Sequence, residues 1–209
     1  MLNITRTIGL ALIVAVTTAG AQETARVSVA STSKLWIEGT SNVHNWKCDA
    51  TTLDASIDID AAVAQLSTAA PKMLKKVTVK VPVKSLKCGH GKMDDNLYKA
   101  LKADDNAEIR YVMASFEAIA GETKDEFTLR TVGKLTIAGT ENAVTMNVAA
   151  TRMTDGTIKA TGTVPILMTA FGVKPPTAIF GTIRAGDEVT IKFELSVGPK
   201  VIAAALQQK

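Results

Sequence analysis

Apolar and polar residues alternate along most of the chain. In KKVTVKVPVKSL the valines at positions 77, 79, 81 and 83 fall on one face, and lysine, threonine and proline residues fall on the other. A period of two residues is typical of a β-strand with one buried face. The same period occurs in LDASIDID, EFTLRTVGKLTI, AVTMNVAATRM, TIKATGTVPILM and EVTIKFELSV. The pattern therefore predicts a protein that is mostly β.

Three positions interrupt the strand pattern. In EIRYVMASFEAI the apolar face shifts between Met113 and Phe116, which predicts a β-bulge. Because proline cannot donate a backbone hydrogen bond, Pro82 and Pro165 are each expected at an edge, a bulge or a strand start. Many strands with one apolar face favour a closed barrel or a sandwich, and the pattern alone does not separate the two.

One segment, GHGKMDDNLYKALKADDN, has the pattern of a helix. Met93, Leu97 and Leu101 recur at intervals of four residues and form a narrow apolar stripe. Asp94 or Asp95 is expected to cap the start of the helix. We expect the helix to cover one end or side of the β core; the alternative is a lid whose apolar stripe faces a ligand.

The N-terminus has the features of a signal peptide. Arg6 precedes the apolar run from Ile8 to Val16, and Ala19-Gly20-Ala21 provides an A-x-A cleavage site. The run is shorter than the roughly 20 residues that span a bilayer. We therefore expect a signal peptide over residues 1–21, a single domain over 22–198 and a C-terminal tail over 199–209. In a bacterium the mature protein would be periplasmic.

Charge and motifs narrow the class of function. The signal region holds one of the 24 basic residues and none of the 20 acidic ones, which leaves a net charge of +3. Because the basic residues are scattered, a nucleic-acid partner is not expected, whereas transient contact with anionic lipid headgroups stays open. No G-x-S-x-G, H-E-x-x-H or phosphate-binding glycine loop occurs, and histidine occurs twice. We therefore do not expect an enzyme.

The two cysteines and two histidines form two pairs, His44 with Cys48 and Cys88 with His90. An exported chain with two cysteines favours a Cys48–Cys88 disulfide. A Cys₂His₂ zinc site built from all four residues is the alternative, although neither spacing is usual for zinc. Free or redox-active thiols are the third interpretation, without the C-x-x-C motif of thiol oxidoreductases.

Four segments carry a resemblance to a known family. TSNVHNWKCDAT, KCGHGKMDDNLYKALKADDNAEIRY, GKLTIAGTENAVTM and MTAFGVKPPTAIFGTIRAGDEVTIKFEL occur in this order, and together they resemble the YceI family of exported bacterial lipid-binding proteins. The resemblance extends from about Val27 to Val197. It implies an all-β fold, an extended lipocalin-like barrel of eight antiparallel strands with a short covering α-helix. It also implies a long apolar interior that holds a polyisoprenoid chain, such as the tail of a quinone.

The composition agrees with such an interior, because small side chains and few aromatic residues leave room inside an eight-stranded barrel. The expected ligand is an isoprenoid lipid or quinone, with no other cofactor, and a homodimer is one option that the resemblance leaves. A periplasmic structural or stress protein without a specific ligand is the alternative. The loop TAFGVKPPTAIFG is either a rim of the barrel mouth or an ordinary crossover loop with two core aromatics. The residues expected to contact the lipid are Leu35, Ile37, Leu97, Leu101, Met113, Met146, Phe171 and Phe180.

Overall fold

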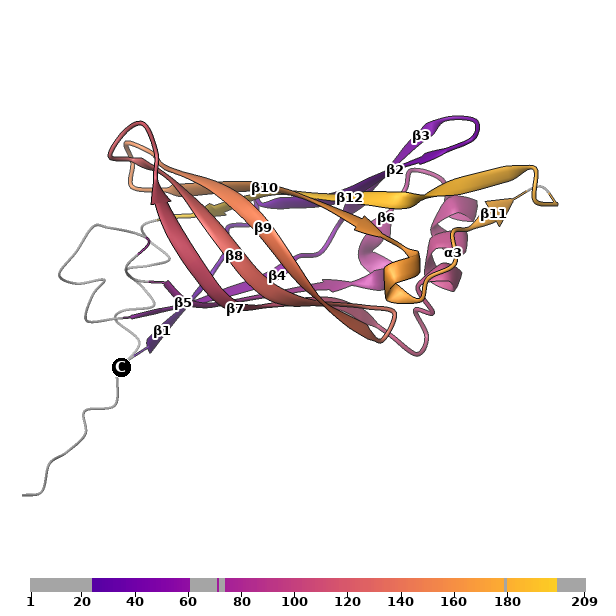
Figure 1. Ribbon diagram of the computed structural model, residues 1–209, viewed down its shortest axis with the longest axis horizontal. Coiled ribbons are helices and arrows are strands. Elements are labelled where there is room, and N and C mark those ends of the chain that lie inside the picture. Colours follow the sequence, from indigo (N-terminus) through magenta and orange to yellow (C-terminus); the bar gives the residue numbers. More distant parts are fainter. Residues whose placement is uncertain (1–23, 61–70, 72–73, 179, 199–209) are drawn as a thin grey trace, which may run out of the picture.

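The computed structural model describes residues 24–60, 71, 74–178 and 180–198, which form one strongly curled antiparallel sheet and a single α-helix (Figure 1). The predicted signal peptide over residues 1–21 and the tail over 199–209 lie outside the described residues. The elements, in chain order, are β1 (Thr24–Ser28), β2 (Lys34–Ser41), β3 (Asn45–Ala50), β4 (Asp54–Asp60), β5 (Leu74–Pro82), η1 (Val83–Ser85), β6 (Leu86–Lys87), α3 (Gly91–Ala100), β7 (Glu108–Ala120), β8 (Glu126–Ile137), β9 (Thr140–Arg152), β10 (Ile158–Leu167), η2 (Thr169–Phe171), β11 (Thr177–Ala178) and β12 (Ile183–Val197).

The order of strands in the sheet is β1-β4-β5-β7-β8-β9-β10-β12-β2-β3-β6, with β11 paired to β12. The chain itself connects the two sides of this order, because β5 continues through η1 into β6, which pairs with β3. The backbone N–H of Thr51, after β3, donates to the carbonyl of Ser85 over 2.9 Å. The sheet therefore closes into a long barrel at the end where α3 lies, which we call the α3 end (Figure 1).

The prediction of an all-β, lipocalin-like barrel with a short helix is confirmed, but the strand count of eight is wrong. The described residues form twelve strands. Two of the four additional strands are short segments, since β6 and β11 have only two residues each. Such short strands carry no readable alternation in the sequence.

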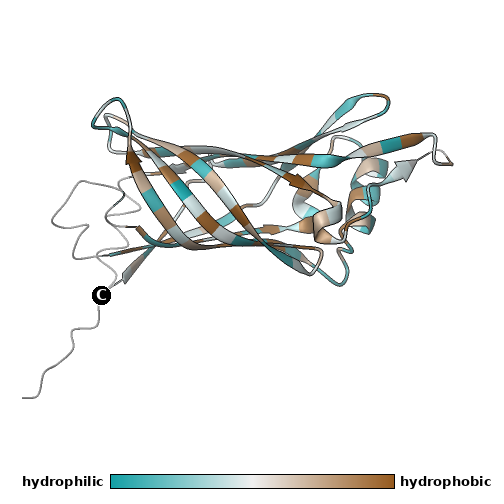
Figure 2. Cartoon of the chain, viewed as in Figure 1, coloured by the Kyte–Doolittle hydropathy of each residue, from teal (hydrophilic) through white to brown (hydrophobic). Residues whose placement is uncertain are grey.

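The long strands follow the predicted alternation, and residues of opposite hydropathy succeed one another along β7, β8 and β9 (Figure 2). The predicted bulge in β7 is confirmed by a register shift between Met113 and Ser115. Pro82 is the last residue of β5. Pro165 lies beyond the part of β10 that pairs with β9, which ends at Gly162. Both prolines therefore occupy places where a missing N–H disturbs few ladder hydrogen bonds.

The helix α3 begins earlier than the sequence predicted. Its N-cap is His90, so the expectation that Asp94 or Asp95 caps the helix is wrong. Asp94 lies in the first turn and accepts a hydrogen bond from the N–H of Cys88 over 2.7 Å. The chain reverses at Gly89, whose φ of +80° suits glycine, and this turn brings the donor to the carboxylate. Within the described part of the chain, no helix has the length and apolar character needed to cross a membrane.

The main packed core lies at the α3 end. Leu101 follows α3 and is 7% exposed, whereas Lys99 on the opposite side of the helix is exposed. Leu86 and Val83, which flank the junction of β5 and β6, are almost completely buried. The buried members of this core are Val81, Val83, Leu86, Leu101, Ala103, Leu135, Ile137, Phe171 and Val173.

The predicted disulfide between Cys48 and Cys88 is confirmed. It joins β3 to the segment just before α3, and Cys48 is 1% exposed. Because both sulfur atoms are in the bond, the alternative Cys₂His₂ site has no thiolate ligands. His44 lies in the β2–β3 turn and His90 caps α3. Among the described residues, no cluster of metal-binding side chains was found.

Candidate functional site

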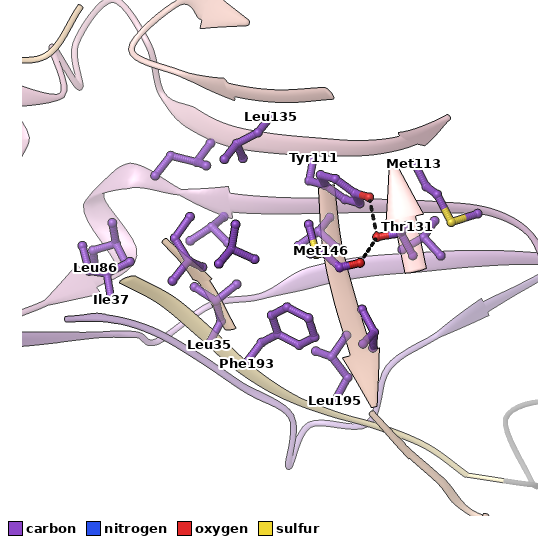
Figure 3. Close-up of a pocket in the computed structure, with 17 residues that line it drawn as sticks. Leu35, Ile37, Leu86, Tyr111, Met113, Thr131, Leu135, Met146, Phe193 and Leu195 are labelled. Atoms are coloured by element: carbon purple, nitrogen blue, oxygen red, sulfur yellow. Dashed lines mark hydrogen bonds between the residues drawn. The ribbon is translucent and has the colours of Figure 1, made fainter. Parts of the chain in front are cut away.

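An apolar cavity of about 140 Å³ lies inside the central part of the barrel (Figure 3). Strands β2, β5, β7, β8, β9, β10 and β12 contribute to its wall, together with β6 at the α3 end. Almost all of the lining side chains are aliphatic, aromatic or methionine. They are Leu35, Ile37, Val77, Val79, Val81, Leu86, Ile109, Tyr111, Met113, Thr131, Leu135, Met146, Val148, Val164, Ile191, Phe193 and Leu195.

Strand alternation places these side chains inside. On β12, Phe193 lines the cavity, while its neighbours Lys192 and Glu194 border a polar groove on the outer surface. On β2, Ile37 points inward and Glu38 outward, where its carboxylate accepts hydrogen bonds from Lys192 and Trp36 that lower its pKa. Each of these two strands thus presents apolar side chains to the inside of the barrel and charged side chains to the outside.

The cavity is longer than it is wide. Val77 and Val81 are both in its wall and stand four residues apart on β5, which corresponds to about 13 Å at the usual rise of a strand. A volume of about 140 Å³ spread over such a length describes a narrow tunnel. A tunnel of this shape suits an extended chain better than a compact ring.

Two glycines let aromatic rings lie along the wall. A Cβ atom at Gly162 would overlap the ring of Phe193, its cross-strand neighbour on β12. A Cβ atom at Gly133 would likewise overlap the ring of Tyr111 on β7. The rings therefore rest against the backbone of the neighbouring strand, a packing that larger residues at these glycines would prevent.

Tyr111 and Thr131 are the two residues of the tunnel wall with polar side-chain atoms, and these atoms are used within the wall. The Tyr111 hydroxyl donates to Thr131 Oγ1 over 3.2 Å, and Thr131 Oγ1 donates to the Met146 carbonyl over 3.4 Å (Figure 3). Burial raises the pKa of the Tyr111 phenol, and the hydrogen bond with Thr131 partly offsets this effect. The wall thus presents only apolar atoms to the space inside.

A second, smaller apolar cavity of about 60 Å³ lies next to the tunnel at the α3 end. Ile37, Ile109 and Ile191 line both cavities, so a single layer of side chains separates them. The rest of its wall comes mainly from α3, η2 and the adjoining strand ends, namely Trp46, Leu97, Leu101, Ile137, Ile166, Met168, Phe171, Val173 and Val189.

The residues expected to contact a lipid fall into three places. Leu35, Ile37, Met113 and Met146 line the tunnel. Leu97, Leu101 and Phe171 line the smaller cavity, as Ile37 also does. Phe180 lines neither cavity and is fully exposed on the turn between β11 and β12. The expected loop TAFGVKPPTAIFG is thus divided, with Phe171 in the core and Phe180 in solvent.

Several wall residues were missed by the sequence analysis. Phe193 and Leu195 stand at alternate positions in EVTIKFELSV, a strand that the pattern identified without assigning its inner face. Ile191 precedes them at the same spacing. The alternation in this strand could have identified all three. Tyr111 stands two residues before Met113, ahead of the bulge, so its place on the same face as Met113 could also have been predicted.

The model of the YceI-like domain matches residues 15–197 of this chain. No curated protein matches the sequence at a significant level. Among solved structures, BcnA from Burkholderia cenocepacia has a TM-score of 0.61 at 21% identity, over 80% of this chain and 98% of that one. A polyisoprenoid-binding domain from Saccharophagus degradans has a TM-score of 0.60 at 12% identity, over 84% and 99% of the two chains. The YceI protein of Campylobacter jejuni has a TM-score of 0.54 at 20% identity, over 74% and 85%. These three likenesses establish the fold.

Proposed function

Because the chain belongs to the YceI-like family, we propose that it is a carrier which holds one long apolar lipid chain in the tunnel. The observation that carries this proposal is the wall itself, which offers only apolar atoms over about 13 Å of its length. The ligand class that we infer is a polyisoprenoid or the tail of an isoprenoid quinone. The likeness to a polyisoprenoid-binding domain supports this class.

The energetics suit a carrier. Each buried CH₂ group gains about 0.8 kcal/mol relative to water, and the same chain gains a similar amount in a bilayer. Transfer between membrane and protein is therefore close to balance, and the shape of the tunnel decides which chain is held. A polar headgroup finds no hydrogen-bonding partner along the wall, so it stays outside the apolar section.

The tunnel has to adjust to hold a long chain. A dry apolar cavity of about 150 Å³ holds a molecule the size of benzene, which is shorter than an isoprenoid tail. Met113 and Met146 line the wall, and methionine changes conformation easily. Rotation of the three isoleucines shared with the smaller cavity would extend the tunnel toward the α3 end.

Organic extraction of protein purified from its native source, followed by mass spectrometry, tests the proposal. We expect about one long isoprenoid chain per barrel. Val148 faces the tunnel and Ala149, the next residue of β9, is exposed. Val148→Phe should therefore lower the amount of bound lipid at least about tenfold, because the ring fills space that the chain needs, while Ala149→Phe should not change it. The absence of lipid above background, or equal losses in the two variants, would favour a structural or stress protein without a ligand.

We also propose that the protein acts in the periplasm. The support is the A-x-A sequence at residues 19–21 after an apolar run. Sequencing of the N-terminus of protein from a periplasmic extract should begin at Gln22. Retention of Met1 in the mature protein would contradict export through this signal.

A further inference from the structure

Two hairpin turns project beyond the barrel at the α3 end. The β11–β12 turn extends past the helix, and the β2–β3 turn rises away from the barrel on the same side of the molecule (Figure 1). Asn42 connects them: its N–H donates to the Arg184 carbonyl over 3.1 Å, and its side-chain amide donates to the Thr182 carbonyl over 2.8 Å. The Arg184 N–H donates in return to Asn42 Oδ1 over 2.8 Å. We call this pair of connected turns, residues 41–45 and 180–184, the tip.

The tip exposes two apolar side chains. Phe180 is fully exposed and Val43 is 58% exposed. Phe180 also has a φ of +53°, a left-handed conformation that costs free energy for an aromatic residue. A phenylalanine held in this way contributes nothing to the core of the barrel, so packing does not explain it.

The tip carries the cation Arg184 and no carboxylate, and a second cation, Lys174, lies outside the tip on the segment before β11. Residues 39–46 and 171–186 contain Lys174, Arg184 and His44 but neither aspartate nor glutamate. Lys174 is exposed, and Arg184 Nε donates to the Gly181 carbonyl over 2.9 Å, next to Phe180. Exposed apolar side chains among cations, with no anion in the same segments, match the interface of an anionic bilayer.

We propose that the tip is a membrane-docking surface, in which Phe180 and Val43 enter the headgroup region of an anionic bilayer while Arg184, and Lys174 from the segment before β11, face its phosphates. The smaller cavity lies close to the tip, since Trp46, which follows Asn45 on β3, lines that cavity. Trp46 also lines a groove on the outer surface and donates its Nε1–H to the Thr40 carbonyl over 3.0 Å. Docking by the tip therefore places the α3 end of the interior next to the lipid. The proposed carrier function explains why the protein would need a docking surface. The evidence for the docking surface does not depend on that function.

Co-sedimentation with vesicles of phosphatidylethanolamine and phosphatidylglycerol, containing no isoprenoid, tests the docking surface. Phe180→Ser should weaken binding at least about tenfold, because the buried ring is lost, and Val43→Ser should weaken it less. Lys174→Gln should weaken binding a few-fold on these vesicles and leave binding unchanged on neutral phosphatidylcholine vesicles. Ile119→Ser is the matched control, since Ile119 is 46% exposed and lies near the C-terminal end of β7, outside the tip. This substitution should not affect binding.

Two results would overturn the docking surface. The first is that wild type does not bind vesicles, or that Phe180→Ser and Ile119→Ser bind them equally well. The second is a concentration-dependent dimer in sedimentation velocity that Phe180→Ser abolishes, which would assign the tip to a second copy of the chain. Lipid extraction from the wild type distinguishes this failure from failure of the carrier function. Bound isoprenoid in the wild type supports the carrier function even if the vesicle experiments overturn the docking surface, and vesicle binding without bound isoprenoid supports the docking surface alone.

Discussion

The α3 end and the central section of the barrel use the same strands but are packed differently. At the α3 end, Leu86, Val83 and Phe171 are at most 3% exposed, and the space between α3, η2 and the strands is filled except for the smaller cavity of about 60 Å³. In the central section, side chains such as Ile37 and Ile191 are only partly buried, because they border the tunnel. One barrel thus contains a mostly filled section and a more open one.

The difference indicates how the fold combines stability with binding. An unfilled apolar cavity costs the contacts that its lining atoms would otherwise make. The mostly filled end has a disulfide, a helix and a tyrosine, Tyr98, whose hydroxyl bonds to the carbonyls of Lys84 and Leu86. We infer that the α3 end supplies stability, which allows the central section to remain open for a ligand.

The largest effect should come from truncating the same residue type in both places. Phe171→Ala should lower the free energy of unfolding by about 3–5 kcal/mol, because its ring is only 3% exposed and its loss would greatly enlarge the smaller cavity. Phe193→Ala should cost only about 2 kcal/mol, because its ring is partly buried and borders the larger tunnel, so that mainly the transfer free energy of the ring is lost. Urea denaturation of lipid-free protein measures both. Equal losses would contradict the distinction between a mostly filled and a more open section.

Removal of the disulfide should have the next largest effect. Replacing Cys48 and Cys88 together by serine should lower the free energy of unfolding by about 2–4 kcal/mol; the chain-entropy model gives about 4 kcal/mol for a separation of 40 residues. Intact-mass measurement checks the bond, since reduction should add two hydrogen atoms and no thiol should be alkylated beforehand. Two freely alkylated thiols in protein taken directly from the periplasm would contradict it.

A charge on the inner side of α3 should have an intermediate effect. Leu97 lines the smaller cavity, so Leu97→Asp should lower the free energy of unfolding by about 2 kcal/mol, because its carboxylate is buried without a partner. It should also reduce the amount of bound lipid if the chain reaches this cavity. Lys99→Asp, on the exposed side of the same helix, should change the stability by less than about 0.5 kcal/mol. Small and equal effects would show that the stripe does not face the interior.

The sequence predicted features that depend on local periodicity. Alternation identified the strands and their inner faces, as for Val77, Val79 and Val81, and spacing identified the stripe that includes Leu97. The even number of cysteines in an exported chain favoured the disulfide. Features that depend on pairing between distant strands could not be predicted. The close approach of the Phe193 ring to Gly162 requires the register of β10 on β12, and the hydrogen bond from Asn42 to Thr182 joins two turns that are 140 residues apart in the sequence.

The smallest effect concerns the polar pair in the tunnel wall. Thr131→Val removes the acceptor of the Tyr111 hydroxyl and should lower the free energy of unfolding by about 1 kcal/mol. It should also raise the pKa of Tyr111 further, because burial already raises this pKa and the hydrogen bond with Thr131 offsets it in the wild type.

The sign of the pH dependence follows from this direction. A phenol with a raised pKa in the folded state contributes stability that is present below its unfolded pKa of about 10, and that is lost as the pH rises through the folded value. Absorbance titration of tyrosinate measures the shift, and comparison with wild type assigns it, since the chain has only two tyrosines. An unchanged or lowered pKa in Thr131→Val would mean that water reaches the hydroxyl. A wet tunnel wall would remove the main reason to assign this section to an apolar chain.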